Sequence, residues 1–232
     1  MVALDLADEL EFSEGDALEI VDQIGWVGPG DGEPVLFDLP TRENLVVRAL
    51  ELAGRTAHVR LVKRIPPGAG LGGGSADAAA TLRWAGVGDP ELASQLGADV
   101  PFCLSGGHAI VRGVGEIVAA LAPVEMAVLL FTPSFGVSTA SVYEAFDEVG
   151  APEQGASQND LEKAALVVEP RLARFRDLFA ELAGRRPTLA GSGATWFLEC
   201  DPHGAAALAN SLSAAVASEG LRAVVKVAHA VA

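Results

Sequence analysis

The sequence has 232 residues, and its 31 Asp and Glu residues outnumber its 16 Lys and Arg residues, which gives a formal net charge of −15. Most of such a surface would repel DNA or RNA, and because no basic run offsets the charge we expect no nucleic-acid partner. Half of the residues are hydrophobic, enough for one large or two small domains. No apolar stretch is long enough to span a membrane, and the N-terminus is acidic, so we expect a soluble, cytoplasmic protein without a membrane partner.

Cys103 and Cys200 are the only cysteines. A disulfide framework needs more than one possible pair, and neither cysteine has the spacing of a metal ligand. We therefore expect two free thiols in a reducing compartment and no metal site made by the protein.

The first half of the chain carries strand and helix patterns in turn. Alternating apolar residues predict strands over 6–12, 18–22 and 56–65, with a turn at 13–17 and a loop at 27–40. Capping residues and apolar periodicity predict helices over 41–54, 75–86 and 90–97, the first two capped by Thr41 and Ser75. The run 102–121 predicts paired strands around Gly106 and Gly107.

The pattern changes after Pro123, where we place a boundary between two domains, 1–123 and 124–232. The second domain is predicted to contain strands over 126–133, 196–200 and 221–232 and helices over 138–150, 159–168, 170–184 and 203–220, with a polar loop at 152–158. An order of strand, helices, strand, helix and strand predicts a compact α+β unit of the ferredoxin-like type.

The run RIPPGAGLGGGSADAAATL places many glycines between a predicted strand and an Ala-rich helix. Glycine costs conformational entropy, so such a loop indicates close approach of backbone N–H groups to an anion at the helix N-terminus. A Walker-A loop is excluded because no G-K-[ST] occurs. Gly68, Gly70 and Gly73 formally satisfy G-x-G-x-x-G, but the acidic residue at a suitable distance, Asp89, lies in a predicted turn instead of ending a strand.

The loop resembles the P-x-x-x-G-L-G-[GS]-[GS]-S-[SA] motif of the GHMP kinases, because Pro66, Gly70, Leu71, Gly72 and Ser75 all match. The resemblance implies that the loop wraps the phosphates of ATP. The implied ATP-binding residues are Pro66, Pro67, Gly68, Ala69, Gly70, Leu71, Gly72, Gly73, Gly74, Ser75 and Ala76. Lys63 and Arg64 add positive charge beside the loop, or are simply solvated residues at the end of a strand.

Within that family, GADVPFCLSGGHAIVRGVGE, ENLVVRAL, NDLE and LAGSGATWF are similar to segments of the branch that phosphorylates the 2-hydroxyl of 4-diphosphocytidyl-2-C-methyl-D-erythritol. The resemblance implies an α+β, two-domain GHMP kinase fold, with an N-terminal domain like ribosomal protein S5 domain 2 and a ferredoxin-like C-terminal domain. It implies ATP and this cytidine diphosphate methylerythritol as small-molecule partners, in a monomer or homodimer. Another GHMP kinase or a non-catalytic nucleotide-binding remnant are the alternatives.

Asp99, in the GADVPF run, matches the catalytic aspartate of the family and would orient or deprotonate the substrate hydroxyl. The alternative is a turn or cap residue. The resemblance assigns substrate contacts to Tyr143, Asn159, Gly191, Ser192 and Gly193. Tyr143 would stack on the cytosine, unless it is a core residue; Asn159 is equally well a helix cap; and the loop 191–193 is either a backbone N–H site or a structural turn.

The sequence departs from the family pattern at two places, and each departure leads to an expectation. Ala76 stands where many relatives have a second Ser, so we expect Mg²⁺ to be held chiefly by ATP and water. The family's A-K-[ILV]-N strand, with its catalytic Lys, and its G-Y-H segment do not occur here. We therefore expect a chain that begins at Met1 to bind ATP but to be a poor catalyst.

Overall fold

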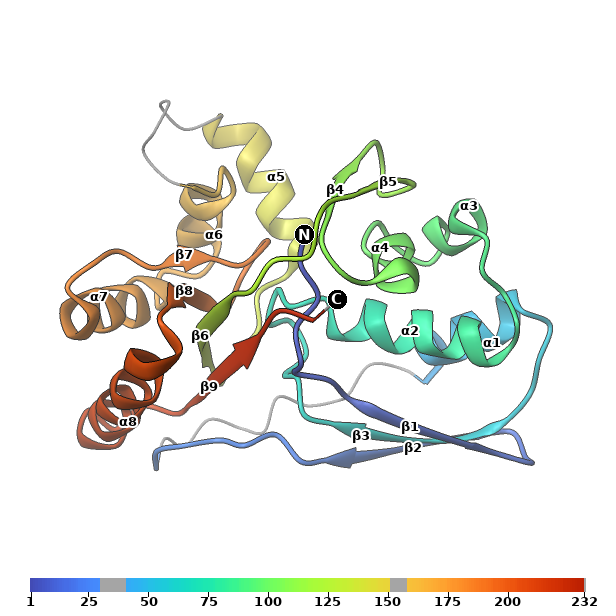
Figure 1. Cartoon of the computed structure of the whole chain (residues 1–232), viewed down its shortest axis with the longest axis horizontal. Helices are drawn as coiled ribbons and strands as arrows, with labels where there is room; N and C mark the ends of the chain where they lie inside the picture. Colours follow the sequence, from blue (N-terminus) through green and yellow to red (C-terminus); the bar gives the residue numbers. More distant parts are fainter. Residues whose placement is uncertain (30–40, 151–157, 232) are drawn as a thin grey trace.

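The computed structural model describes residues 1–29, 41–150 and 158–231. The predicted loops at 27–40 and 152–158 lie almost entirely outside these residues. Figure 1 shows the two larger sheets with their helices on either side of an extended N-terminal segment. Among the described residues, no helix combines the length and the apolar character that crossing a membrane requires.

The first sheet has the order β1-β3-β2. Its strands are β1 (Glu9–Ser13), β2 (Ala17–Asp22) and β3 (His58–Lys63). The strands at the N-terminus were expected, but they do not pair with each other, because β3 lies between them, antiparallel to β1 and parallel to β2. The turn crosses directly over the start of β3: a Cβ added to Gly15, which has a φ of +143°, would lie 2.9 Å from the Cβ of His58.

Helices cover this sheet (Figure 1). α1 (Leu45–Leu52) and α2 (Gly73–Trp84) lie on it, and α3 (Pro90–Ser94) and α4 (Val100–Ser105) pack in turn on α2. A 3₁₀ helix at Thr41–Glu43 precedes α1. Two predicted caps are wrong. Asn44 caps α1 by accepting a hydrogen bond from Val46 N at 2.9 Å. The N-cap of α2 is Gly72, so that Ser75 lies within the first turn of the helix.

The prediction of paired strands over 102–121 is half wrong. Its first residues belong to helix α4, and Gly106 ends that helix with a φ of +70°. The paired strands are β4 (Ala109–Arg112) and β5 (Ile117–Ala120), which are joined by a turn at 113–116. Apolar residues such as Phe102 and Leu104 suit a short buried helix as well as a strand, so periodicity could not decide between them.

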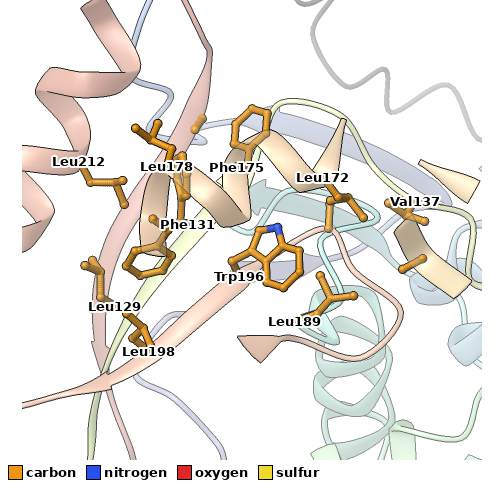
Figure 2. Packing of buried hydrophobic residues seen from close by; sticks show 14 of the residues in the cluster. Leu129, Phe131, Val137, Leu172, Phe175, Leu178, Leu189, Trp196, Leu198 and Leu212 are labelled. Atoms are coloured by element: carbon orange, nitrogen blue, oxygen red, sulfur yellow. The ribbon is translucent and has the colours of Figure 1, made fainter. Parts of the chain in front are cut away.

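The second sheet is antiparallel and has the order β7-β8-β6-β9, which confirms the ferredoxin-like prediction. Its strands are β6 (Ala127–Pro133), β7 (Thr188–Leu189), β8 (Trp196–Cys200) and β9 (Ala223–His229), and its helices are α5 (Thr139–Val149), α6 (Glu162–Val168), α7 (Leu172–Ala183) and α8 (Pro202–Ser218). The helices bury one face of the sheet. Figure 2 shows the fully buried Trp196 within this core, near Phe131 and Phe175.

The other face of the second sheet packs against the first part of the chain. Leu71, from the predicted phosphate loop, packs on Val128, Leu130 and Ala228 of β6 and β9, together with residues of the N-terminal segment. All seven residues of β6 are consequently buried. The predicted boundary at Pro123 lies in the connection between β5 and β6. Because Leu71 packs on the second sheet, the glycine loop contacts both parts of the molecule.

Candidate active site

The loop between β3 and α2 approaches the second part of the chain through its backbone. Gly70 has a φ of +72°, and a Cβ at this position would lie 2.3 Å from Ala190 O and 2.6 Å from Gly193 O. The carbonyl of Gly68 accepts from Ala194 N at 3.1 Å, and that of Ala69 accepts from Thr195 N at 3.0 Å. The two glycine-rich loops predicted from the sequence are therefore in direct contact, and only a residue without a side chain fits at Gly70.

Helix α2 presents its N-terminus at this junction. Gly72, the N-cap, has a φ of +67° and makes no side-chain capping bond. The first N–H groups of an α-helix have no acceptor within the helix, and the helix dipole favours negative charge at that end. A polyanion such as a phosphate chain can therefore accept hydrogen bonds there.

A cavity of about 720 Å³ opens over this helix terminus. Every residue of the predicted ATP loop except Ala76 lines it, and so do Asp99, Tyr143, Gly191 and Ser192. Asn159 and Gly193 are absent from its lining. Lys63 is the only lysine or arginine among the described lining residues.

Asp99 lies at the N-terminus of α4, but its side chain makes no capping hydrogen bond to that helix. Its Oδ2 would lie 3.8 Å from a Cβ placed on Gly72, so the carboxylate faces the start of α2. The residue is accessible from the cavity, yet the surrounding protein displaces enough water to raise the pKa of Asp99 above its ordinary value. A carboxylate with a raised pKa beside an anion site can accept a proton from a bound hydroxyl group.

The second part of the chain contributes one face of helix α5 and the loop at 190–193. Thr139 and Tyr143 are four residues apart on α5, so both face the cavity. Tyr143 is 54% exposed, which does not fit a core residue. Ser192 is buried, and its Oγ hydrogen-bonds to Thr139 Oγ1 at 2.9 Å, so this loop is attached to the start of α5.

Asn159 and Gly193 have their polar groups engaged with the protein. The side-chain amide of Asn159 donates to Leu189 O at 2.8 Å and to Gly191 O at 2.7 Å, while its Oδ1 accepts from Leu161 N at 2.9 Å. The N–H of Gly193 donates to Ala190 O at 2.9 Å.

A buried ion-pair cluster at the base of the first loop was not predicted. Lys63 pairs with Asp8 and, at 2.9 Å, with Asp77, and all three side chains are at least 93% buried. Asp8 Oδ1 also accepts from Arg64 N and Ile65 N. Burial raises the pKa of Asp77 to about 6, while Lys63 opposes the rise and Asp8 adds to it. Of the two basic residues weighed from the sequence, Arg64 is the exposed one, paired with Glu9.

The signal for this cluster was weak in the sequence. Lys63 ends a strand with alternating residues, and Asp77 follows the loop in an Ala-rich helix. Each position is compatible with solvent exposure. Asp8 is 55 residues from Lys63 along the chain, and no local pattern links the two.

Comparisons with known proteins agree with this geometry. Residues 44–107 match the family model described as GHMP kinases N terminal domain. A protein of Pelotomaculum thermopropionicum named 4-diphosphocytidyl-2-C-methyl-D-erythritol kinase is 40% identical over 193 residues, covering 68% of this chain and 67% of that protein. The protein of the same name from Paramagnetospirillum magneticum is 34% identical over 226 residues, covering 83% and 76%.

Solved structures give the same result over nearly the whole chain. The crystal structure of a 4-(cytidine 5'-diphospho)-2C-methyl-D-erythritol kinase matches with a TM-score of 0.67 and 33% identity, covering 97% of this chain and 87% of that chain. A homoserine kinase from Cytophaga hutchinsonii shares the fold, with a TM-score of 0.63 at 18% identity and the same coverage. The identity and coverage of these relatives place the chain in the GHMP kinase family of ATP-dependent phosphotransferases, in its 4-diphosphocytidyl-2-C-methyl-D-erythritol kinase branch.

Proposed function

We propose that the chain binds ATP and transfers its γ-phosphoryl group to the 2-hydroxyl of 4-diphosphocytidyl-2-C-methyl-D-erythritol. The observation that carries the proposal is that one cavity contains the N-terminus of α2, residues of both glycine loops and the carboxylate of Asp99. The substrate is the one named for the relatives that are 33 to 40% identical to this chain.

The phosphates of ATP are assigned to the loop 66–75 and the first turn of α2. The apolar side chains of Ile20, Leu45 and Leu61 line the cavity beside the first sheet and suit the adenine base. Tyr143 comes from the second part of the chain and suits the cytidine substrate, with its ring stacking on the cytosine, while the backbone of Gly191 and Ser192 is proposed to face the phosphates of ATP. The two ligands would then bind to different parts of the cavity, with the γ-phosphate between them.

Asp99 is assigned the role of catalytic base. It would accept the proton of the 2-hydroxyl as that oxygen forms a bond to the γ-phosphorus, and the bond from this phosphorus to the β-phosphate oxygen breaks to release ADP. The raised pKa of Asp99 supports the role, because a base is most effective when its pKa approaches the working pH.

Magnesium is proposed to enter with ATP and to be held by its phosphates and by water. Within residues 1–29, 41–150 and 158–231, no group of three or more His, Cys, Asp or Glu side chains is arranged to hold a metal ion. When bound, the ion would neutralise charge on the phosphates. The cavity residues themselves would orient the phosphates and exclude water.

The experiment is an assay of phosphate transfer from γ-labelled ATP. The cytidine substrate is compared with homoserine and mevalonate. Asp99→Asn should retain ATP binding, because charge is removed with little change of shape, and should lose about 100-fold or more in turnover. Turnover close to that of the unmodified chain would show that Asp99 is not the base, and preferential phosphorylation of homoserine or mevalonate would overturn the substrate.

A further inference from the structure

The second glycine loop is held at several points by other parts of the structure. Ser192 is bonded to Thr139 of α5, and the N–H groups of Ala194 and Thr195 donate to carbonyls of the first loop. Asn159 adds two bonds at the opposite end, to Leu189 O and Gly191 O. Its donors therefore fix the last residue of β7 and the first glycine of the loop together.

The two halves of the Asn159 amide make different kinds of contact. The Nδ2 group donates to the two loop carbonyls, which lie 30 and 32 residues away along the chain. The Oδ1 atom accepts locally, from Leu161 N at the start of α6. A side chain needed only as a helix cap would use its oxygen alone, and Asp or Ser serve that purpose equally well. The two donors require an amide.

Resting on the proposed function, we propose that Asn159 is a positioning residue for the loop 190–193, and that it sets this loop against the phosphates of ATP without contacting either ligand. Its absence from the cavity lining fits this role. Gly191 and Ser192, which the loop presents to the cavity, would carry the effect. The family resemblance implies a substrate contact for Asn159, and the positioning role takes the place of that contact.

The deciding variant is Asn159→Asp, which has the same shape and can still accept from Leu161 N. It loses both donors and places a carboxylate against the carbonyls of Leu189 and Gly191. We expect the dissociation constant for ATP to rise about tenfold or more, because two hydrogen bonds are replaced by repulsion. Amide hydrogen exchange of residues 189–193 in the unliganded protein should become faster.

Two further variants serve as a matched control and as a substitute for Asn159→Asp. Asn210→Asp makes the same chemical change on the exposed side of α8. It should change neither the dissociation constant for ATP nor the amide exchange of residues 189–193. If Asn159→Asp is too unstable to fold, Asn159→Ser removes the donors to both carbonyls without adding charge. It should speed exchange of the same residues and weaken ATP binding, while an oxygen that can accept from Leu161 N is retained.

The outcomes separate this inference from the proposed function. Unchanged exchange and unchanged ATP affinity in a folded Asn159→Asp protein would overturn the inference. So would a loss of affinity for the cytidine substrate alone, since that would indicate a direct contact. If the unmodified chain does not bind ATP, the proposed function fails, and faster exchange in Asn159→Asp still supports the positioning role.

Discussion

The two glycine-rich loops meet at one site but are held in place by different chemistry. The first loop follows a buried cluster of charges, in which Lys63 bridges Asp8 and Asp77, and Asp8 accepts two backbone N–H groups. The second loop is held by neutral groups, the amide of Asn159 and the hydroxyls of Thr139 and Ser192.

The difference has an energetic consequence. A buried ion pair contributes little net stability when it is intact, but the loss of one partner leaves an uncompensated charge in a low dielectric. A neutral hydrogen bond contributes about 0.5–1.5 kcal/mol, and its loss is correspondingly mild. We therefore expect the stability of the first loop to depend on charge and pH. The stability of the second loop should depend on its hydrogen-bond donors.

The largest expected effect is the loss of stability when the buried charge cluster loses its cation. Lys63→Met leaves Asp8 and Asp77 facing each other without a cation, and should lower the free energy of unfolding by about 3–5 kcal/mol. Denaturation by urea measures this. The neighbouring Arg64→Met is the matched control, because Arg64 forms an exposed pair with Glu9 and should cost less than about 1 kcal/mol. Equal losses in both variants would contradict the role of the cluster.

Variants at two glycines of the first loop distinguish the packing between the two loops, tested at Gly70, from the binding of the nucleotide, tested at Gly72. Gly70→Ala would place a methyl group against the carbonyls of Ala190 and Gly193, so it should lower both stability and ATP affinity. At Gly72 the nearest atom is Asp99 Oδ2, at 3.8 Å, so Gly72→Val would extend into the cavity. Apart from the strain at its positive φ, this variant should chiefly prevent ATP binding. Calorimetry that finds wild-type ATP affinity in a folded Gly72→Val protein would contradict the phosphate site.

Tyr143, on α5, tests whether the cytidine substrate and ATP bind to different parts of the cavity. It lies on the side of the second loop, so Tyr143→Ala should weaken binding of the cytidine substrate by about 1–3 kcal/mol through the lost stacking, and should leave ATP binding almost unchanged. Titration calorimetry with each ligand gives the two values. Equal loss for both ligands would indicate that Tyr143 is merely structural.

The smallest expected effect is the pH dependence of the charged cluster. Burial raises the pKa of Asp77 to about 6 from an ordinary value of 3.8. The stability associated with the protonated form is therefore complete below about pH 4 and is lost as the pH rises through 6. The charged groups that act on Asp77 are Lys63, which lowers its pKa, and Asp8, which raises it.

Asp77→Asn removes this titration. Between about pH 4 and 6 the unmodified chain should lose of the order of 2 kcal/mol relative to the variant. Urea midpoints measured across that range give the difference. A constant difference between the two proteins would show that Asp77 titrates normally.

Local patterns predicted much of the fold and of the site. The glycine loop, the capped helix at 138–150 and the order of elements in the second domain, apart from the two-residue strand β7, were predicted, because periodicity and turn residues act over a few neighbours. Asp99 and Tyr143 were identified by resemblance, and the structure brings both to one cavity. The helix α4 was missed because a six-residue apolar run fits either a helix or a strand.

By itself the sequence determined the chemistry available at the site: glycines that permit close backbone approach, an aspartate in a recognisable motif, and one aromatic ring. Only the tertiary structure decided that β3 separates β1 from β2, that Lys63 is buried between two carboxylates, and that the donors of Asn159 hold the loop. The partners in these side-chain contacts are 14 to 55 residues apart. A side chain's local pattern gives its type and its face, but its charge state and role depend on which distant groups the fold brings to it.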